Sequence, residues 1–202
     1  MTNLERFVID QKASHFKVQA FASAMTAGLG HNPTIGIRDF SGEARFVPGT
    51  LDAASLTLSI RAASLVVESE MNKDDRRTLE RIMNEQVLST SKHPVVSYQS
   101  TNVRAVKLGE GLYRVELSGT LTLNGLSRIQ KVISQVTIGP YSLRATGNFE
   151  ISQSNFAIAP VHVAGGLLTL RDELKFAFFI MARQDSALGL GTQDVSHATA
   201  DR

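Results

Sequence analysis

The sequence predicts an all-β protein with one short helix, in which about eight antiparallel strands form a sandwich or an up-and-down barrel. Apolar and polar residues alternate with a period of two over most of the 202 residues, which is typical of strands that bury one face. Turn signals separate these segments at fairly regular spacing, and a helical period occurs only once. A barrel of about eight strands is just wide enough to hold one small or slender ligand.

The clearest element is a long hairpin over Tyr113–Ile138. It turns at Asn124-Gly125, the dipeptide that best tolerates positive φ at both centres of a two-residue turn. That turn places Leu117 opposite Val132, whereas a three-residue loop places Leu117 opposite Ile133 and reverses the faces of the whole return strand. With the two-residue turn, the polar side chains of the return strand that face the lumen are Arg128, Gln130 and Ser134.

Three segments in the first third of the chain alternate as strands do: Phe7–Phe21, Ile35–Val47 and Ser55–Val67. In the first, Phe16 and Val18 share the apolar face. Gly42 lies within the second, where a glycine usually indicates a bend or bulge.

The period then changes to that of a helix over Asn72–Leu88. Its apolar residues fall on one stripe, formed by Leu79, Ile82, Met83 and Val87. Asn72 is a suitable N-cap, and Asp74 suits the positive end of the helix dipole. This is the single helix that the sequence predicts with a clear pattern.

Strand patterns return after His93-Pro94 and continue to Gln184. Besides the hairpin, the expected strands are Val95–Val106, Leu143–Ile151, Phe156–Val163, Leu167–Leu170 and Leu174–Met181. The last two are expected to face each other across Arg171-Asp172-Glu173. Leu174–Met181 is apolar on both faces, so we expect the helix or a second subunit to cover its outer side. Residues 1–184 are thus predicted to form one domain, and the Ser-, Gly- and Ala-rich residues 185–202 a disordered tail.

Composition excludes several classes of function. The net charge is only +2, and no run of five basic residues occurs, so nucleic-acid binding is not expected. The chain has no cysteine, which excludes disulfides and thiolate chemistry. No run of apolar residues is long enough to cross a membrane as a helix, and the first residues do not resemble an export signal, so a cytoplasmic location is expected.

No known catalytic motif is present in the sequence. The five histidines show no metal-ligand spacing, and there is no nucleophile elbow, P-loop or dinucleotide fingerprint, so neither a metal nor a cofactor is expected. The densest polar cluster is His31-Asn32-Pro33 with Arg38-Asp39. It fits either a surface loop with an ion pair or a polar rim at the barrel mouth that meets a ligand head group. The phenylalanines, likewise, either fill a core or line a cavity.

Read together, the motifs resemble the YceI-like family of lipid-binding proteins over about residues 6–183. The likeness rests on segments in a shared order: FVIDQKASHFKVQAF, FSGEARFVP, IRAASL followed by NKDDRRTL, SKHPVVSYQST, LSGTLTLNGLSRIQKV, FEISQSNFAI and DELKFAFFI. The resemblance implies an antiparallel eight-stranded lipocalin-like barrel with a helix against it, and it favours the two-residue turn. It also implies binding of a polyisoprenoid or isoprenoid quinone-like molecule in the lumen, without catalysis, by a protein that pairs as a homodimer.

The residues expected to bind this ligand are apolar side chains of the inward faces, together with two polar residues at the mouth: Phe16, Val18, Phe40, Phe46, Leu58, Ile60, Leu117, Leu121, Phe149, Phe176, Phe178, His31 and Arg38. Two alternatives remain open. One is an enzyme on the same barrel that uses His31 with Asp39 or Arg38. The other is a barrel whose interior is filled by side chains and which serves as an interaction or stress-response module.

Overall fold

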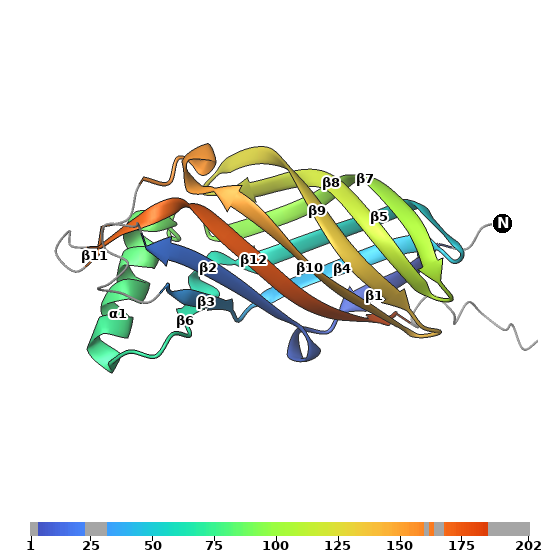
Figure 1. Ribbon diagram of the computed structural model, residues 1–202, viewed down its shortest axis with the longest axis horizontal. Coiled ribbons are helices and arrows are strands. Elements are labelled where there is room, and N and C mark those ends of the chain that lie inside the picture. Colours follow the sequence, from blue (N-terminus) through green and yellow to red (C-terminus); the bar gives the residue numbers. More distant parts are fainter. Residues whose placement is uncertain (1–3, 23–31, 160–161, 164–167, 186–202) are drawn as a thin grey trace, which may run out of the picture.

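Eight antiparallel strands close into a barrel (Figure 1). The computed structural model describes residues 4–22, 32–159, 162–163 and 168–185. In their hydrogen-bonded order, the strands are β1 (Glu5–Ile9), β4 (Phe40–Val47), β5 (Thr50–Arg61), β7 (Val95–Gly109), β8 (Leu112–Leu123), β9 (Leu126–Ile138), β10 (Ser142–Ser152) and β12 (Leu168–Gln184). The ring closes because β12 pairs with β1, at Phe7↔Gln184 through Ile9↔Ala182. The predicted fold class, an eight-stranded antiparallel barrel with one short helix, is confirmed.

Three strands of the ring are interrupted and then continue at one end of the barrel. The continuations are β2 (His15–Ala22), β3 (Thr34–Ile37) and β6 (Leu65–Val67), and β3 pairs with both of the others. The predictions of unbroken strands over Phe7–Phe21, Ile35–Val47 and Ser55–Val67 were therefore wrong at their centres.

Local hydrogen bonds explain the first and third interruptions. The Asp10 carboxylate accepts hydrogen bonds from the backbone N of Lys12 (3.1 Å) and of Ala13 (3.2 Å), which holds η1 (Gln11–Ala13) in a 3₁₀ turn. Between β5 and β6 lies a second 3₁₀ turn, η2 (Ala62–Ser64), which places a buried serine hydroxyl against the backbone of Asp39. Inward side chains change from odd to even positions across η1, from Phe7 and Ile9 to Phe16 and Val18. They change from even to odd positions across η2, from Leu58 and Ile60 to Leu65 and Val67.

The hairpin has the two-residue register. Asn124 and Gly125 have φ of 50° and 74°, and the pairs Leu121↔Arg128 and Leu117↔Val132 occur as predicted. Side chains at alternate positions of β9 from Val132 onward are buried, so the apolar face of the return strand lies inside. The three-residue alternative is excluded by this pairing.

The last third of the chain differs from prediction in two places. β12 is one long strand, and Arg171-Asp172-Glu173 is not a turn but an irregularity between Leu170 and Leu174 in its pairing with β2. The expected strand Phe156–Val163 is instead the 3₁₀ turn η4 (Gln153–Phe156), followed by the two-residue β11 (His162–Val163).

Side-chain contacts explain both differences. Asp172 accepts hydrogen bonds from the backbone N and Oγ of Ser154, both at 2.7 Å, and Gln153 donates to the backbone O of Arg171 (2.8 Å). These bonds join η4 to the irregular part of β12. The expected tail lies outside the described residues except for Asp185, whose backbone N donates to the O of Arg6 (2.9 Å).

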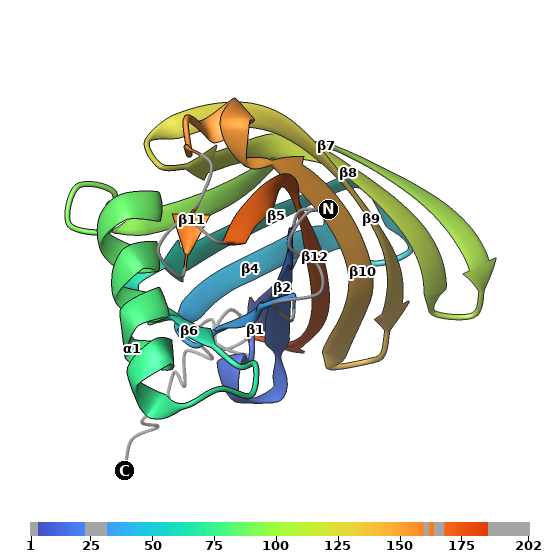
Figure 2. The ribbon, with the colours of Figure 1, turned by 60° about the vertical axis from the view of Figure 1, so that its left-hand side comes forward.

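The helix α1 (Lys73–Ile82) lies at one end of the barrel, next to β6 (Figure 2). Asn72 caps it by accepting a hydrogen bond from the backbone N of Asp75 (2.8 Å), and a π-helical turn, η3 (Met83–Val87), follows it. One expectation was that this helix covers the outer side of the last strand; instead, α1 lies at the end of the barrel and does not cover β12. On the outer face of β12, the ring of Phe179 stacks on that of His15, with centroids 5.3 Å apart. No helix of the described residues is long and apolar enough to cross a membrane.

Candidate functional site

Two clusters of buried side chains surround a cavity inside the barrel. The first cluster includes Phe7, Phe46 and Leu143, and the second includes Met83 and Phe156 from the end with the helix. Some partly buried side chains pack against both clusters: Ile35, Leu58, Leu65, Val96, Leu117, Leu174, Phe176 and Phe178. The space that remains among them is the lumen.

The lumen is narrow and almost wholly apolar. The cavity volume is about 140 Å³. The lining comes from inward-facing positions of β2, of β3 and of every ring strand. Because strand residues alternate between faces, each strand contributes every second side chain, and the intervening polar residues lie outside.

Most of the residues predicted to bind a ligand lie together around this cavity. Those that line it are Phe16, Phe46, Leu58, Ile60, Leu117, Leu121, Phe149, Phe176 and Phe178. Val18 and Phe40 are buried in the first cluster without lining the cavity. Whether any of them binds a ligand stays a prediction.

Aromatic pairs hold much of the lining in place. Phe149 on β10 stacks on Phe176 on β12, with ring centroids 4.8 Å apart and planes 10° apart. Phe16 meets Phe40 edge-on at 4.9 Å and lies 6.1 Å from Phe178. Pairs of this kind contribute about 0.5–1.5 kcal/mol beyond the burial of their area. The cavity is therefore shaped by rings that support one another.

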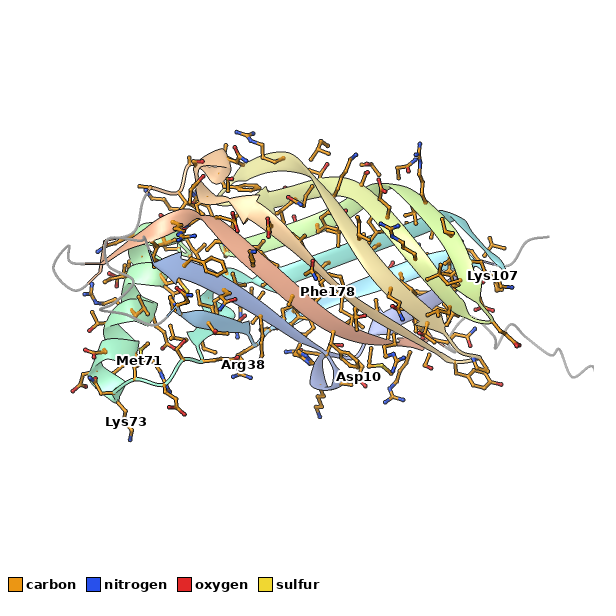
Figure 3. All side chains as sticks on the ribbon, viewed as in Figure 1. Asp10, Arg38, Met71, Lys73, Lys107 and Phe178 are labelled. Carbon is orange, nitrogen blue, oxygen red and sulfur yellow. The ribbon has the colours of Figure 1, made fainter. Side chains whose placement is uncertain are left out.

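Arg38, one of the two polar residues expected at the mouth, is not part of this lining. Arg38 is 63% exposed and pairs with Glu68 (2.8 Å), and Figure 3 shows it at the edge of the barrel, away from Phe178. Asp39 pairs instead with Arg61 (2.8 Å). Arg38 thus belongs to a surface ion pair. His31 lies outside the described residues.

Sequence reasoning missed Tyr98, a polar residue that lines the cavity. Its Oη donates a hydrogen bond to the backbone O of Gln130 (3.3 Å), and burial raises the pKa of the phenol to about 12. The signal was present, because Val96 and Tyr98 alternate with polar residues on β7. An irregularity in the pairing between Ser100 and Asn102 reverses the faces along the rest of that strand, so the inward series continues at Val103.

Two glycines give the rings their positions. A Cβ on Gly119 would lie 2.6 Å from Cζ and Oη of Tyr98, and one on Gly147 would lie 2.6 Å from Cζ of Phe178. Both glycines face inward, so each ring lies against bare backbone on the neighbouring strand. The rings are therefore held against the wall, which leaves the centre of the lumen free.

The chemistry of this site is that of an apolar binding cavity. Gln130 and Ser134, which were expected to face the lumen, do line it. The same expectation for Arg128 was wrong, because Arg128 is exposed and borders an outer hollow. Tyr98 is the one described lining residue with a titratable group. At a pKa of about 12, its phenol is neutral at physiological pH. Among the described residues, no three His, Asp or Glu side chains gather so as to hold a metal ion.

Comparison with known proteins matches both the sequence and the fold. A family model described as YceI-like domain matches residues 7–182. Proteins named UPF0312 protein from Azotobacter vinelandii and Ectopseudomonas mendocina are each 28% identical to the chain over 123 residues. That stretch is 60% of this chain and 57% of each relative, so the chain matches little more than half the length of these relatives.

Three solved structures share the fold. BcnA of Burkholderia cenocepacia superimposes with a TM-score of 0.65 at 15% identity, covering 86% of this chain and 98% of BcnA. A polyisoprenoid-binding domain from Saccharophagus degradans gives 0.63 at 12% identity, with 89% and 98% coverage. A YceI protein of Campylobacter jejuni gives 0.56 at 18% identity, with 75% and 84% coverage.

Proposed function

Because this chain belongs to the YceI-like family, we propose that it binds one long, slender apolar molecule in its lumen, a polyisoprenoid or an isoprenoid quinone-like lipid. The observation that carries the proposal is the closed barrel with a narrow apolar cavity lined by its buried side chains. The name of the Saccharophagus degradans domain, polyisoprenoid binding, supports the choice of lipid class.

The physics of the proposal is burial. A chain that loses about 300 Å² of apolar surface gains roughly 7 kcal/mol at about 25 cal/mol per Å². This gain alone corresponds to a dissociation constant of about 7 μM. The ordering of the ligand and the loss of its translational freedom weaken binding further, so a dissociation constant of tens of micromolar or more is expected for a burial of this size. The narrow bore suits a linear chain better than a compact ring system.

The proposal includes a binding or carrier role without catalysis. A reaction needs a group that gains or releases a proton, or one that polarises the substrate, at the reacting atoms. The lining instead offers apolar side chains, serine hydroxyls, the Gln130 amide and a neutral tyrosine. The alternative of an enzyme around His31 has no support from the described residues, since Arg38 and Asp39 are each engaged in a surface ion pair. The alternative of a fully packed interior is at odds with the cavity.

Native mass spectrometry after mild purification tests the proposal. We expect the protein to retain a hydrophobic molecule, or to take up farnesol and longer prenyl alcohols at one per chain. Protein that is repeatedly recovered empty and takes up none of these compounds would rule the function out.

We also propose that the protein pairs as a homodimer. Large apolar side chains are exposed on the outer faces of β7 and β9, including Leu108 (57%) and Ile129 (71%), and pairing would remove such surface from water. Light scattering coupled to size exclusion measures the mass directly, and a monomer at all concentrations would contradict the expectation.

A further inference from the structure

The barrel wall is incomplete between β9 and β10. The last pair of residues between these strands is Ile133↔Asn148. Beyond it, β9 stays paired with β8 as far as Leu126, and β10 stays paired with β12 as far as Ser152. Each strand therefore keeps its other neighbour while the ladder between the two ends, and we name the stretch without ladder hydrogen bonds the β9–β10 window.

The window is bounded on all sides. Its closed edge is the pair Ile133↔Asn148, and its sides are the unpaired parts of β9 and β10. At the opposite edge, η4 follows β10, and Asn124 in the β8–β9 turn donates a hydrogen bond to the backbone O of Phe156 (3.1 Å). Figure 1 shows this turn and η4, in yellow and orange, next to each other.

Side chains that line the lumen also line a groove on the outside of the window. Gln130, Ser134, Phe149 and Phe178 border the internal cavity, and the same four border an outer groove with Lys131 and Glu150. Gln130 also borders a second outer hollow, on the η4 side. The outer hollow beside β5 shares only two residues with the lumen, Ser55 and Leu56. The larger shared lining at the window places the groove directly outside the lumen.

Other features of the described barrel favour a passage at this point. The ladder between β5 and β7 also ends early, beyond Thr57↔Gln99, but there the backbone N of Leu56 donates a hydrogen bond across the break to Oγ of Ser100 (2.8 Å). At the end formed by β1 and β4, Phe7 and Phe46 are 0% and 2% exposed and their rings stack at 5.0 Å, so that end is sealed. At the window, the backbone O of Gln130 accepts the hydrogen bond from Tyr98, and the Gln130 amide donates to the backbone O of Lys131 (2.8 Å). The Gln130 side chain, which borders both the lumen and the groove, is thus held against its own strand by one hydrogen bond, and a rotation of the side chain would release it.

We propose that the β9–β10 window is the passage through which the lumen ligand enters and leaves, and that the Gln130 side chain is its gate. The inference rests on the proposed function, because it names the route to that same cavity. A slender chain can thread between Phe149 and Gln130 without any ladder hydrogen bond being broken. An amide at the gate and charges of both signs outside, on Lys131 and Glu150, suit the passage of a neutral polar head group.

A reversible crosslink across the window provides the test, since the chain has no cysteine of its own. Lys131→Cys and Glu150→Cys place thiols on both sides of the groove, and a short bifunctional, reducible thiol reagent joins them without the strict geometry of a disulfide. The matched control joins Gln135→Cys and Thr146→Cys, which face each other on the same two strands where the ladder is intact. Mass spectrometry establishes that each crosslink is complete.

The measurement is stopped-flow uptake of cis-parinaric acid, a slender fluorescent polyene, with its dissociation constant from titration. The window crosslink is expected to slow uptake and release by about tenfold or more, to leave the dissociation constant within about twofold, and to be reversed by reduction. The control crosslink should change neither rate. Gln130→Ala, which shortens the gate, should raise both rates by about threefold or more.

If the window-crosslinked protein takes up the ligand as fast as the uncrosslinked protein, the inference is overturned. It is also overturned if the Gln130→Ala variant takes up and releases the ligand at unchanged rates. Either result would leave the proposed function intact, because equilibrium binding would persist. The absence of saturable binding to the unmodified protein is a different result, which would overturn the proposed function and this inference together.

Discussion

Leu117→Trp should block the lumen without unfolding the barrel. Leu117 lies opposite Val132 on β9 and Val103 on β7, lines the cavity, and packs against both core clusters. An indole adds about six heavy atoms there, and these displace roughly three to six carbon-sized groups of a ligand. At about 0.8 kcal/mol per buried CH₂, the loss is about 2.4–4.8 kcal/mol. The dissociation constant should rise roughly 50-fold to 2,500-fold.

Titration with farnesol, followed by calorimetry or native mass spectrometry, measures this change. Thr120→Trp is the matched control, because Thr120 lies on the same strand but faces outward, opposite the exposed Ile129. Each variant carries the chain's single tryptophan, so its emission reports the surroundings: apolar for the first, aqueous for the control. A folded Leu117→Trp variant with the affinity of the wild type would refute the placement of the ligand in the lumen.

Three further predictions concern the barrel that forms the site. Phe7→Ala removes a fully buried ring that seals one end of the barrel, so it should lower the free energy of unfolding by about 3–5 kcal/mol and the melting temperature in calorimetry by roughly 6–20 °C. A shift of only a degree or two would show that this end is loosely packed. Gly119→Ala places a methyl group 2.6 Å from the ring of Tyr98 and should lower the free energy of unfolding, measured with denaturant, by about 1–3 kcal/mol. Its control, Gly109→Ala, places the methyl group no nearer than 3.9 Å to the atoms around it and should be close to neutral. Equal effects of the two substitutions would contradict the close approach of the tyrosine ring. The hydrogen bond from Arg6 lowers the pKa of Glu43 below its ordinary 4.5, so the stability that the Glu43 carboxylate contributes is present above that value and is lost as the pH falls through the lowered pKa. In thermal melts across that pH range, the difference in stability between the wild type and Glu43→Gln should be largest near neutrality and vanish in acid. A difference that does not change with pH would count against the pair.

The fold could be predicted from the sequence where a local signal sets a long-range pairing. Asn124-Gly125 favours positive φ at two successive residues, and this one turn sets the register of both hairpin strands. The predicted lumen residues followed from that register and from alternation, since a residue and its neighbour two positions along share a face. Nine of the predicted side chains, among them Leu117 and Phe149, do line the cavity for this reason.

The interruptions could not be predicted, because they depend on groups that meet only in the folded chain. Asp10 holds η1 through its own backbone neighbours, but Arg183, far away in sequence, also donates to its carboxylate (3.0 Å). The hydrogen bonds of Asp172 to Ser154 likewise draw a charged tripeptide, which has the composition of a turn, into the irregular part of β12. A search for turns counts residue types and cannot know which partner lies across the barrel.

The bore of the lumen is set by where side chains are missing as much as by where they are present. Inward positions on eight strands would fill a barrel of this size if all carried large groups. Gly119 and Gly147 lie on β8 and β10, the two neighbours of β9, and each accepts a ring from the strand beside it, Tyr98 or Phe178. The rings are thereby kept against the wall on both sides of β9, the strand that carries Gln130 and borders the window. The same two glycines thus account for a free channel and for its position beside the β9–β10 window. Because the channel lies beside the window, a substitution that widens or closes the channel should change the rate of ligand uptake through the window.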